Sequence, residues 1–119
     1  MKIRIKGNTL RYRLTKSEVA RLGSDGSLEE HTEFAGKTLV YAIEPARNGA
    51  TNLSADFTGD KIVLYMPKEM IKEFVNTERV GFEESSGLLS LLIEKDFVCI
   101  DRVVEDQSDN YPNPSVTCQ

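Results

Sequence analysis

A strict alternation of charged and apolar side chains at the start of the chain limits what it can fold into. In residues 2–6 lysine and arginine alternate with isoleucine, and in residues 10–14 two arginines alternate with three apolar side chains. A period of two places successive side chains on opposite faces of a β-strand. The Gly-Asn-Thr run at residues 7–9 suits a short hairpin loop. The sequence therefore predicts a β-hairpin with one apolar face and one cationic face.

The cationic face of this hairpin is the first candidate site. It carries Lys2, Arg4, Lys6, Arg11 and Arg13. One interpretation is an ordinary solvent-facing surface whose charges are answered by carboxylates on a neighbouring strand. The other is an anion-binding surface for a phosphate-type ligand, formed by Arg4, Lys6, Arg11 and Arg13. The net charge of −4 and the opposite orientation of Tyr12 argue against nucleic acid as the partner.

Two helices and six further strands follow from local patterns. Thr15 and Glu18 form a T-x-x-E capping box, which predicts a short helix ended by the Gly-Ser-Asp-Gly run at residues 23–26. Pro67 suits the first position of a second helix, ended near residue 76. The predicted strands are residues 28–34, 39–44, 52–57, 61–66, 79–84 and 88–94.

These elements repeat the order strand–strand–helix–strand–strand. We interpret the chain as an α+β domain of two ββαββ pseudo-repeats, residues 1–50 and 51–94, followed by an extended C-terminal tail, residues 95–119. The two units would form an antiparallel, barrel-like sheet with two short helices, since closure removes exposed strand edges. If the sheet stays open, an edge strand offers a route to a homo-oligomer.

Length and composition are those of one soluble domain. The chain has 119 residues, of which 39% are hydrophobic and 29% are charged, which excludes disordered and collagen-like classes. Its apolar runs are far shorter than the roughly 20 residues that cross a bilayer. The charged first strand is unlike a secretory signal, so we expect a cytoplasmic protein with no membrane partner.

Metal and catalytic chemistry have a weak basis in the sequence. Cys99, Cys118 and His31 are ligand types for zinc, but they lack the closely spaced pairs of known zinc sites. A disulfide between the two cysteines, or two free thiols, are the alternatives, and a reducing compartment favours free thiols. His31, placed on the same strand face as Glu29 and Glu33, is expected at the surface. No nucleophile motif or phosphate-binding loop is present.

Four stretches of the chain carry a resemblance to known sequences. They read I-R-I-K-G at residues 3–7, R-Y-R-L-T-K-S-E at 11–18, E-K-D-F-x-C at 94–99, and E-D-Q-S-D-x-Y-P-N-P at 105–114. Together they resemble a small uncharacterised bacterial family, a domain of unknown function. The resemblance implies a bacterial cytosolic protein and transfers no catalytic residue.

Three functional interpretations remain open. The sequence favours a non-catalytic soluble domain for binding or interaction, with an unidentified ligand and no cofactor. The first alternative is anion binding on the basic N-terminal hairpin. The second is a metal-binding protein or enzyme that uses Cys99 and the acidic tail, with zinc as the metal.

Overall fold

The computed structural model describes residues 1–85 and 87–97. Along this part of the chain, strands and helices follow the predicted order. The elements are β1 (Lys2–Lys6), β2 (Thr9–Leu14), α1 (Lys16–Asp25), β3 (Leu28–Glu33), β4 (Thr38–Pro45), β5 (Ser54–Thr58), β6 (Lys61–Met66), α2 (Lys68–Asn76), β7 (Gly81–Glu84) and β8 (Ser90–Lys95). The internal duplication stays a prediction, as does the division at residue 50. The predicted tail lies largely outside the described residues.

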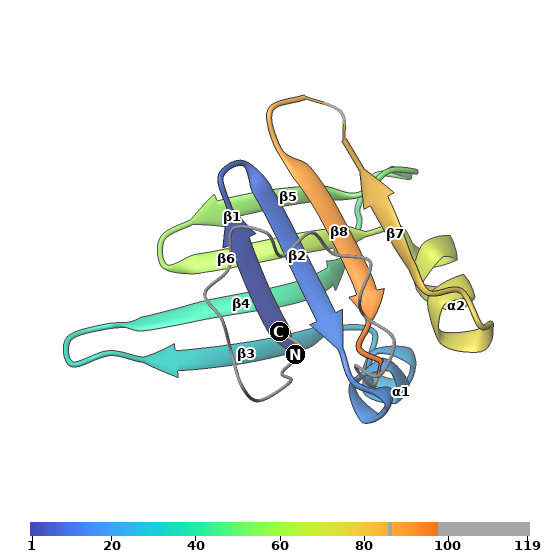
Figure 1. Cartoon of the computed structure of the whole chain (residues 1–119), viewed down its shortest axis with the longest axis horizontal. Helices are drawn as coiled ribbons and strands as arrows, with labels where there is room; N and C mark the ends of the chain where they lie inside the picture. The colour runs from blue at the N-terminus through green and yellow to red at the C-terminus, as the bar shows by residue number, and fades with distance from the viewer. Residues whose placement is uncertain (86, 98–119) are drawn as a thin grey trace, which may run out of the picture.

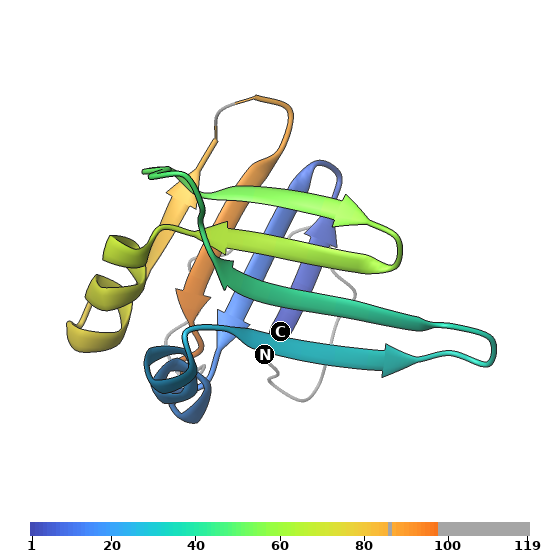
Figure 2. The same cartoon turned by 180° about the vertical axis from the view of Figure 1, so that it is seen from behind.

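The strands form two separate sheets, and the predicted antiparallel barrel-like sheet is wrong. One sheet has the order β1-β2-β8-β7 and the other β3-β4-β6-β5. Each consists of two antiparallel hairpins joined by a parallel pair in the middle, β2 with β8 and β4 with β6. Figures 1 and 2 show the strands of the two sheets crossing at a steep angle, one sheet in front of the other.

The helices explain why each half of the chain is divided between the sheets. After β2 in the first sheet, α1 leads to β3 in the second, and after β6 in the second sheet α2 leads back to β7 in the first. Both helices lie beside each other at the same end of the molecule (Figures 1 and 2). Neither helix of the described chain is long and apolar enough to cross a membrane.

The core lies between the sheets and under the two helices. Its fully buried large side chains are Tyr12, Leu14, Leu22, Ile43, Leu64, Met66, Phe74 and Ile93. The alternation seen in the sequence decides which strand residues enter it, because each strand buries one face. Tyr12 illustrates this: its ring meets Tyr41 edge-on at 6.5 Å between centroids, and burial raises the pKa of its hydroxyl.

The first helix begins as predicted and ends at the last residue of the predicted Gly-Ser-Asp-Gly run. Thr15 Oγ1 accepts from the Glu18 backbone N–H at 3.4 Å, and a Glu18 carboxylate oxygen accepts from the Thr15 N–H at 2.8 Å. This is the predicted capping box. The helix continues through Gly23 to Asp25 and ends at Gly26, whose φ of +79° is the left-handed conformation that glycine adopts without strain.

A close approach between β7 and β8 generates a stability prediction. A Cβ added at Gly81 would overlap the carbonyl oxygen of Ile93 and lie 2.9 Å from Glu94 Cα. We expect Gly81→Ala to lower the free energy of unfolding by about 2 kcal/mol or more, since the obstructing atoms are backbone. Gly36→Ala is the matched control: its Cβ meets nothing within 4 Å, so we expect a change below about 0.5 kcal/mol. Urea denaturation measures both, and equal effects would contradict the close approach.

The Glu18 carboxylate generates a pH prediction. Burial raises its pKa, but hydrogen bonds from the Met1 ammonium and from Thr15 outweigh burial and hold the pKa of Glu18 below its usual value. A lowered folded-state pKa stabilises the fold above the unfolded-state pKa, and that stability is lost as pH falls.

Wild type should therefore lose its stability advantage over Glu18→Gln as the pH falls from about 6 to about 3. The two unfolding curves, measured by circular dichroism at each pH, should converge. If the difference in stability between the two proteins stays constant with pH, the charge of Glu18 does not contribute to the stability of the fold.

Candidate anion-binding site

The first two strands place the five predicted cations on one face of the first sheet. In the register of β1 with β2, Lys2 lies opposite Arg13 and Arg4 opposite Arg11. We call these four side chains, together with Lys6, the basic face. Like charges directly opposite each other on a sheet are unfavourable. The basic face therefore needs compensating negative charge, from the protein or from a ligand.

Part of this compensation comes from β8. Its parallel pairing with β2 places Glu94 beside Arg13. The Arg13 Nε donates to Glu94 Oε1 at 2.7 Å, and the Arg11 Nε lies 3.7 Å from the same oxygen. At the same end Lys2 Nζ lies 3.2 Å from Asp96 Oδ2. At this end the positive charges of the basic face are paired with carboxylates, as in the first interpretation of the sequence, a solvent-facing surface. Arg13 is one of these paired cations.

The other end of the basic face encloses a shallow hollow of about 170 Å³. Arg4, Lys6, Thr9 and Arg11 line it, and we call it the basic hollow. None of these four lining residues is acidic, and the register places Lys6 opposite Thr9. Arg13, the fourth residue of the predicted anion site, is not among them. The structure thus brings three of the four predicted residues together and adds Thr9.

The hairpin loop fixes the position of the basic hollow. Gly7 has a φ of +54°, a left-handed conformation that lets the chain reverse here. The Asn8 carbonyl accepts from the Ser90 N–H at 2.8 Å, and Asn8 Nδ2 donates to the Leu88 carbonyl at 3.2 Å. These hydrogen bonds attach the loop to the start of β8. The hollow is therefore formed by β1 and β2, and β8 holds their connecting loop in place.

The basic hollow offers hydrogen-bond donors and positive charge. Each guanidinium can hold a tetrahedral oxyanion with two parallel N–H donors, and the lysine acts as a point charge. The hydroxyl of Thr9 is a further donor. A volume of 170 Å³ corresponds to about six water molecules, which is room for one oxyanion group.

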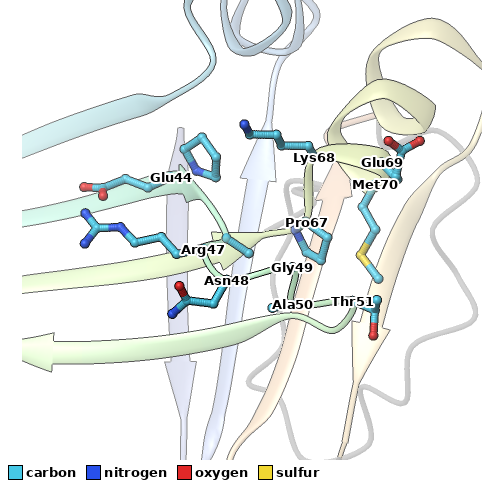
Figure 3. A pocket seen from close by; sticks show the side chains of 12 residues that line it. Glu44, Arg47, Asn48, Gly49, Ala50, Thr51, Pro67, Lys68, Glu69 and Met70 are labelled. Atoms are coloured by element: carbon cyan, nitrogen blue, oxygen red, sulfur yellow. The ribbon is translucent and has the colours of Figure 1, made fainter.

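A larger pocket, of about 750 Å³, lies at the start of α2. It is formed by the loop after β4, residues 46–51, and by Pro67 and the first residues of the helix. Figure 3 shows Glu44 and Arg47 directed to one side of it and Met70 directed toward Thr51. The charged lining side chains are Glu44, Arg47, Lys68 and Glu69. The two negative and two positive charges of these side chains cancel, so the charge of this pocket favours neither anionic nor cationic ligands.

His31, the predicted zinc ligand, lies on β3 in the second sheet, far from the basic face. Its Nε2 is 2.8 Å from Glu29 Oε1, and 56% of its side chain is exposed. This hydrogen bond, with a second from Lys61, lowers the pKa of Glu29. Hydrogen bonds to Glu44 and Glu29 raise the pKa of Lys61. The histidine is part of a surface charge network, on the strand face where the sequence placed it.

Two of the three residues of the predicted zinc site lie outside the described residues. Within residues 1–85 and 87–97, no three His, Cys, Asp or Glu side chains group so as to hold a metal ion. Cys99 and Cys118 lie outside the described residues, so the zinc site and the alternative disulfide stay predictions.

Comparison with known proteins adds the family. The model of a family of unknown function (DUF7009) matches residues 1–115. The chain belongs to the DUF7009 family. This confirms the resemblance to a family without an assigned activity, while the four motifs and the bacterial origin stay predictions. Searches of the curated proteins and of the solved structures found no match.

Sequence analysis of the DUF7009 chain missed two features of the site. The alternation in residues 10–14 showed on which face each arginine lies, but not which strand lies beside them. It therefore did not show that Arg11 lines the hollow whereas Arg13 lies beside Glu94. It also missed the pocket at the start of α2, whose two sides are about 20 residues apart in the chain. The available signal was Asn48-Gly49, a turn pair that adopts left-handed φ values of +59° and +68°.

The balanced end of the basic face generates a prediction for the DUF7009 chain. Arg13 and Glu94 are 12% and 17% exposed, whereas Lys2 is 73% exposed. A double-mutant cycle with Arg13→Gln and Glu94→Gln should give a coupling of about 1 kcal/mol. The cycle with Lys2→Gln and Asp96→Asn is the control and should stay below about 0.3 kcal/mol, because solvent screens the exposed pair. Equal couplings would contradict the structural role of Glu94.

Proposed function

We propose that this DUF7009 protein is a non-catalytic domain that binds a phosphate-type anion in the basic hollow. The observation that carries the proposal is the lining of this hollow. Arg4, Lys6 and Arg11 come from two adjacent strands and line it together with Thr9. Their guanidinium and ammonium groups and the Thr9 hydroxyl are donors that a tetrahedral oxyanion can accept from.

The distribution of charge over the chain supports this proposal. Residues 1–22 carry seven basic side chains and one acidic one, although the net charge of the chain is −4. Negative charge on the rest of the molecule disfavours unspecific attachment to polyanions such as nucleic acid. A local positive hollow on an acidic protein favours a small anion.

The residue types in the basic hollow support binding rather than catalysis. Its four described lining residues supply donors and charge, but none is a general base or a nucleophile with a base beside it. The histidine lies on the other sheet. We also propose that the protein is cytoplasmic and that it can form a homo-oligomer through an edge strand. Neither proposal affects the basic hollow.

Phosphate-dependent thermal stabilisation tests the proposed function. A ligand that binds the folded state raises the melting temperature, and phosphate at about ten times its dissociation constant should raise it by about 6 °C. Sodium chloride at the same ionic strength is the reference, because salt screens surface charges. The double variant Arg4→Gln/Arg11→Gln should lose the phosphate-dependent shift.

The double variant Lys2→Gln/Arg13→Gln is the matched control. It also removes two positive charges, one from each strand and from a directly opposed pair, but it leaves the residues that line the hollow unchanged. Each shift is measured against the melting temperature of the same variant without phosphate. A shift that survives in the Arg4/Arg11 variant, or is lost equally in both variants, would show that the hollow is not the site.

A further inference from the structure

The chain continues beyond Phe97 from the end of the basic face that carries Lys2. The Asp96 N–H donates to the Leu14 carbonyl at 2.8 Å, and Asp96 Oδ2 lies 3.2 Å from Lys2 Nζ. Phe97 lines an apolar cavity of about 590 Å³ together with Leu14 and Val19. These contacts fix the point from which residues 98–119 continue, and that point is beside the basic face.

The amino-acid sequence of residues 98–119 is acidic. It contains four acidic side chains and one basic side chain, Arg102. Three of the acids, Glu105, Asp106 and Asp109, fall within five consecutive residues, and we call residues 105–109 the acidic run. Opposite charges attract each other most strongly at short range. The charge of this segment therefore complements that of the basic face.

The length of the segment allows the acidic run to reach the basic hollow. Lys2 and Lys6 are the two ends of β1, and four steps along a strand correspond to about 13 Å. The acidic run begins eight residues after Phe97, and eight residues of extended chain span at most about 28 Å. The segment can therefore cover this distance without running straight.

We infer that residues 98–119 fold back over the basic face and place carboxylates of the acidic run in the basic hollow. Lys6 and Arg11 line the hollow, and both can donate charge-assisted hydrogen bonds to a carboxylate. Glu94 Oε1 lies 3.7 Å from the Arg11 Nε. Because a guanidinium has five N–H donors, this contact leaves others of Arg11 for a second carboxylate.

A carboxylate of the same chain competes with a free anion for the donors of the basic hollow. A tethered segment acts at an effective concentration of the order of millimolar, so the hollow is open for only part of the time. The apparent affinity for a free anion falls in proportion to the open fraction. This competition rests on the proposed function, whereas the docking of the segment does not.

Carbodiimide crosslinking of the full chain tests the docking. The reagent joins an amine to a carboxylate in direct contact as an amide, and mass spectrometry of the peptides locates the link. We expect links from Lys6 to the acidic run at low salt. Their yield should fall about tenfold at about 1 M sodium chloride, where charges are screened beyond about 3 Å. The pair Lys2 and Asp96, 3.2 Å apart, is the positive control at low salt.

Two double variants separate docking on the basic face from general electrostatic attraction. Arg4→Gln/Arg11→Gln removes two cations beside Lys6 and should lower the yield of Lys6 links about fivefold or more. Lys68→Gln/Lys72→Gln removes two cations from α2 and should leave the yield unchanged. Circular dichroism verifies that both variants are folded, and the salt dependence of the wild-type links requires neither variant.

Calorimetric titration with inorganic phosphate tests the competition. Glu105→Gln/Asp106→Asn/Asp109→Asn neutralises the acidic run and should tighten phosphate binding about tenfold, which corresponds to a hollow that is open for about a tenth of the time in wild type. The control removes three exposed negative charges from elsewhere in the described chain: Asp25→Asn/Glu33→Gln/Glu78→Gln. The control should change the affinity less than about twofold, because solvent screens exposed charges.

Failure of this inference and failure of the proposed function give different results. Lys6 links without phosphate binding, in wild type and in the neutralised variant, would support the docking and reject the proposed function. If the Lys2–Asp96 link forms and the Lys6 links do not, or if the two double variants give equal yields, the docking is wrong and anion binding is unaffected. Linked dimers in place of linked monomers would place the segment of a second copy on the basic face and also overturn the inference.

Discussion

The parallel pairing of β2 with β8 supports both the core and the candidate site. It sets Leu10 beside Leu91 and Tyr12 beside Ile93 on the inner face, and these are buried core residues. On the outer face the same register sets Arg13 beside Glu94. An isolated hairpin is marginally stable at best in water, so the first hairpin depends on the last one. Because the side-chain period is two, a slip of one residue would exchange the core face with the basic face.

The second sheet repeats this arrangement, with β4 and β6 as its parallel pair. Its outer face is covered by a charge network instead of a basic face. Ala42 is buried there although it lies outside the main core cluster, opposite Glu29 and beside Val63. Long charged side chains such as Lys61 can cover apolar surface with their stems while the charged group stays in water. The two sheets therefore share a layout and differ in the electrostatics of their outer faces.

The basic face shows a conflict between local stability and charge. Two directly opposed pairs of cations lower the stability of the sheet, whereas opposite charges at these positions would raise it. At one end the protein answers this cost with Glu94, which Arg13 holds at 2.7 Å. At the other end three of the four described residues that line the hollow are cationic, and such a concentration of like charge is one of the departures from local consistency found at functional sites.

The sequence by itself determined the local features of this protein. The alternation in residues 2–14 defined the hairpin and its cationic face, the T-x-x-E pattern defined the start of α1, and the position of His31 on the Glu29 face followed from its strand. These features depend on neighbours within a few residues, so periodicity and capping reveal them.

Tertiary structure decided which hairpins meet. Local patterns do not distinguish one closed antiparallel sheet from two sheets that each join a pair of hairpins in parallel, because the same residues are buried in both. The pairing of β2 with β8 joins segments about 80 residues apart, through the packing of side chains such as Tyr12 and Ile93. It also decided that Glu94 lies 2.7 Å from Arg13 and 3.7 Å from Arg11, because the register of β8 beside β2 sets these distances. Only with that register does the basic face have Glu94 beside Arg13 at one end and the basic hollow at the other.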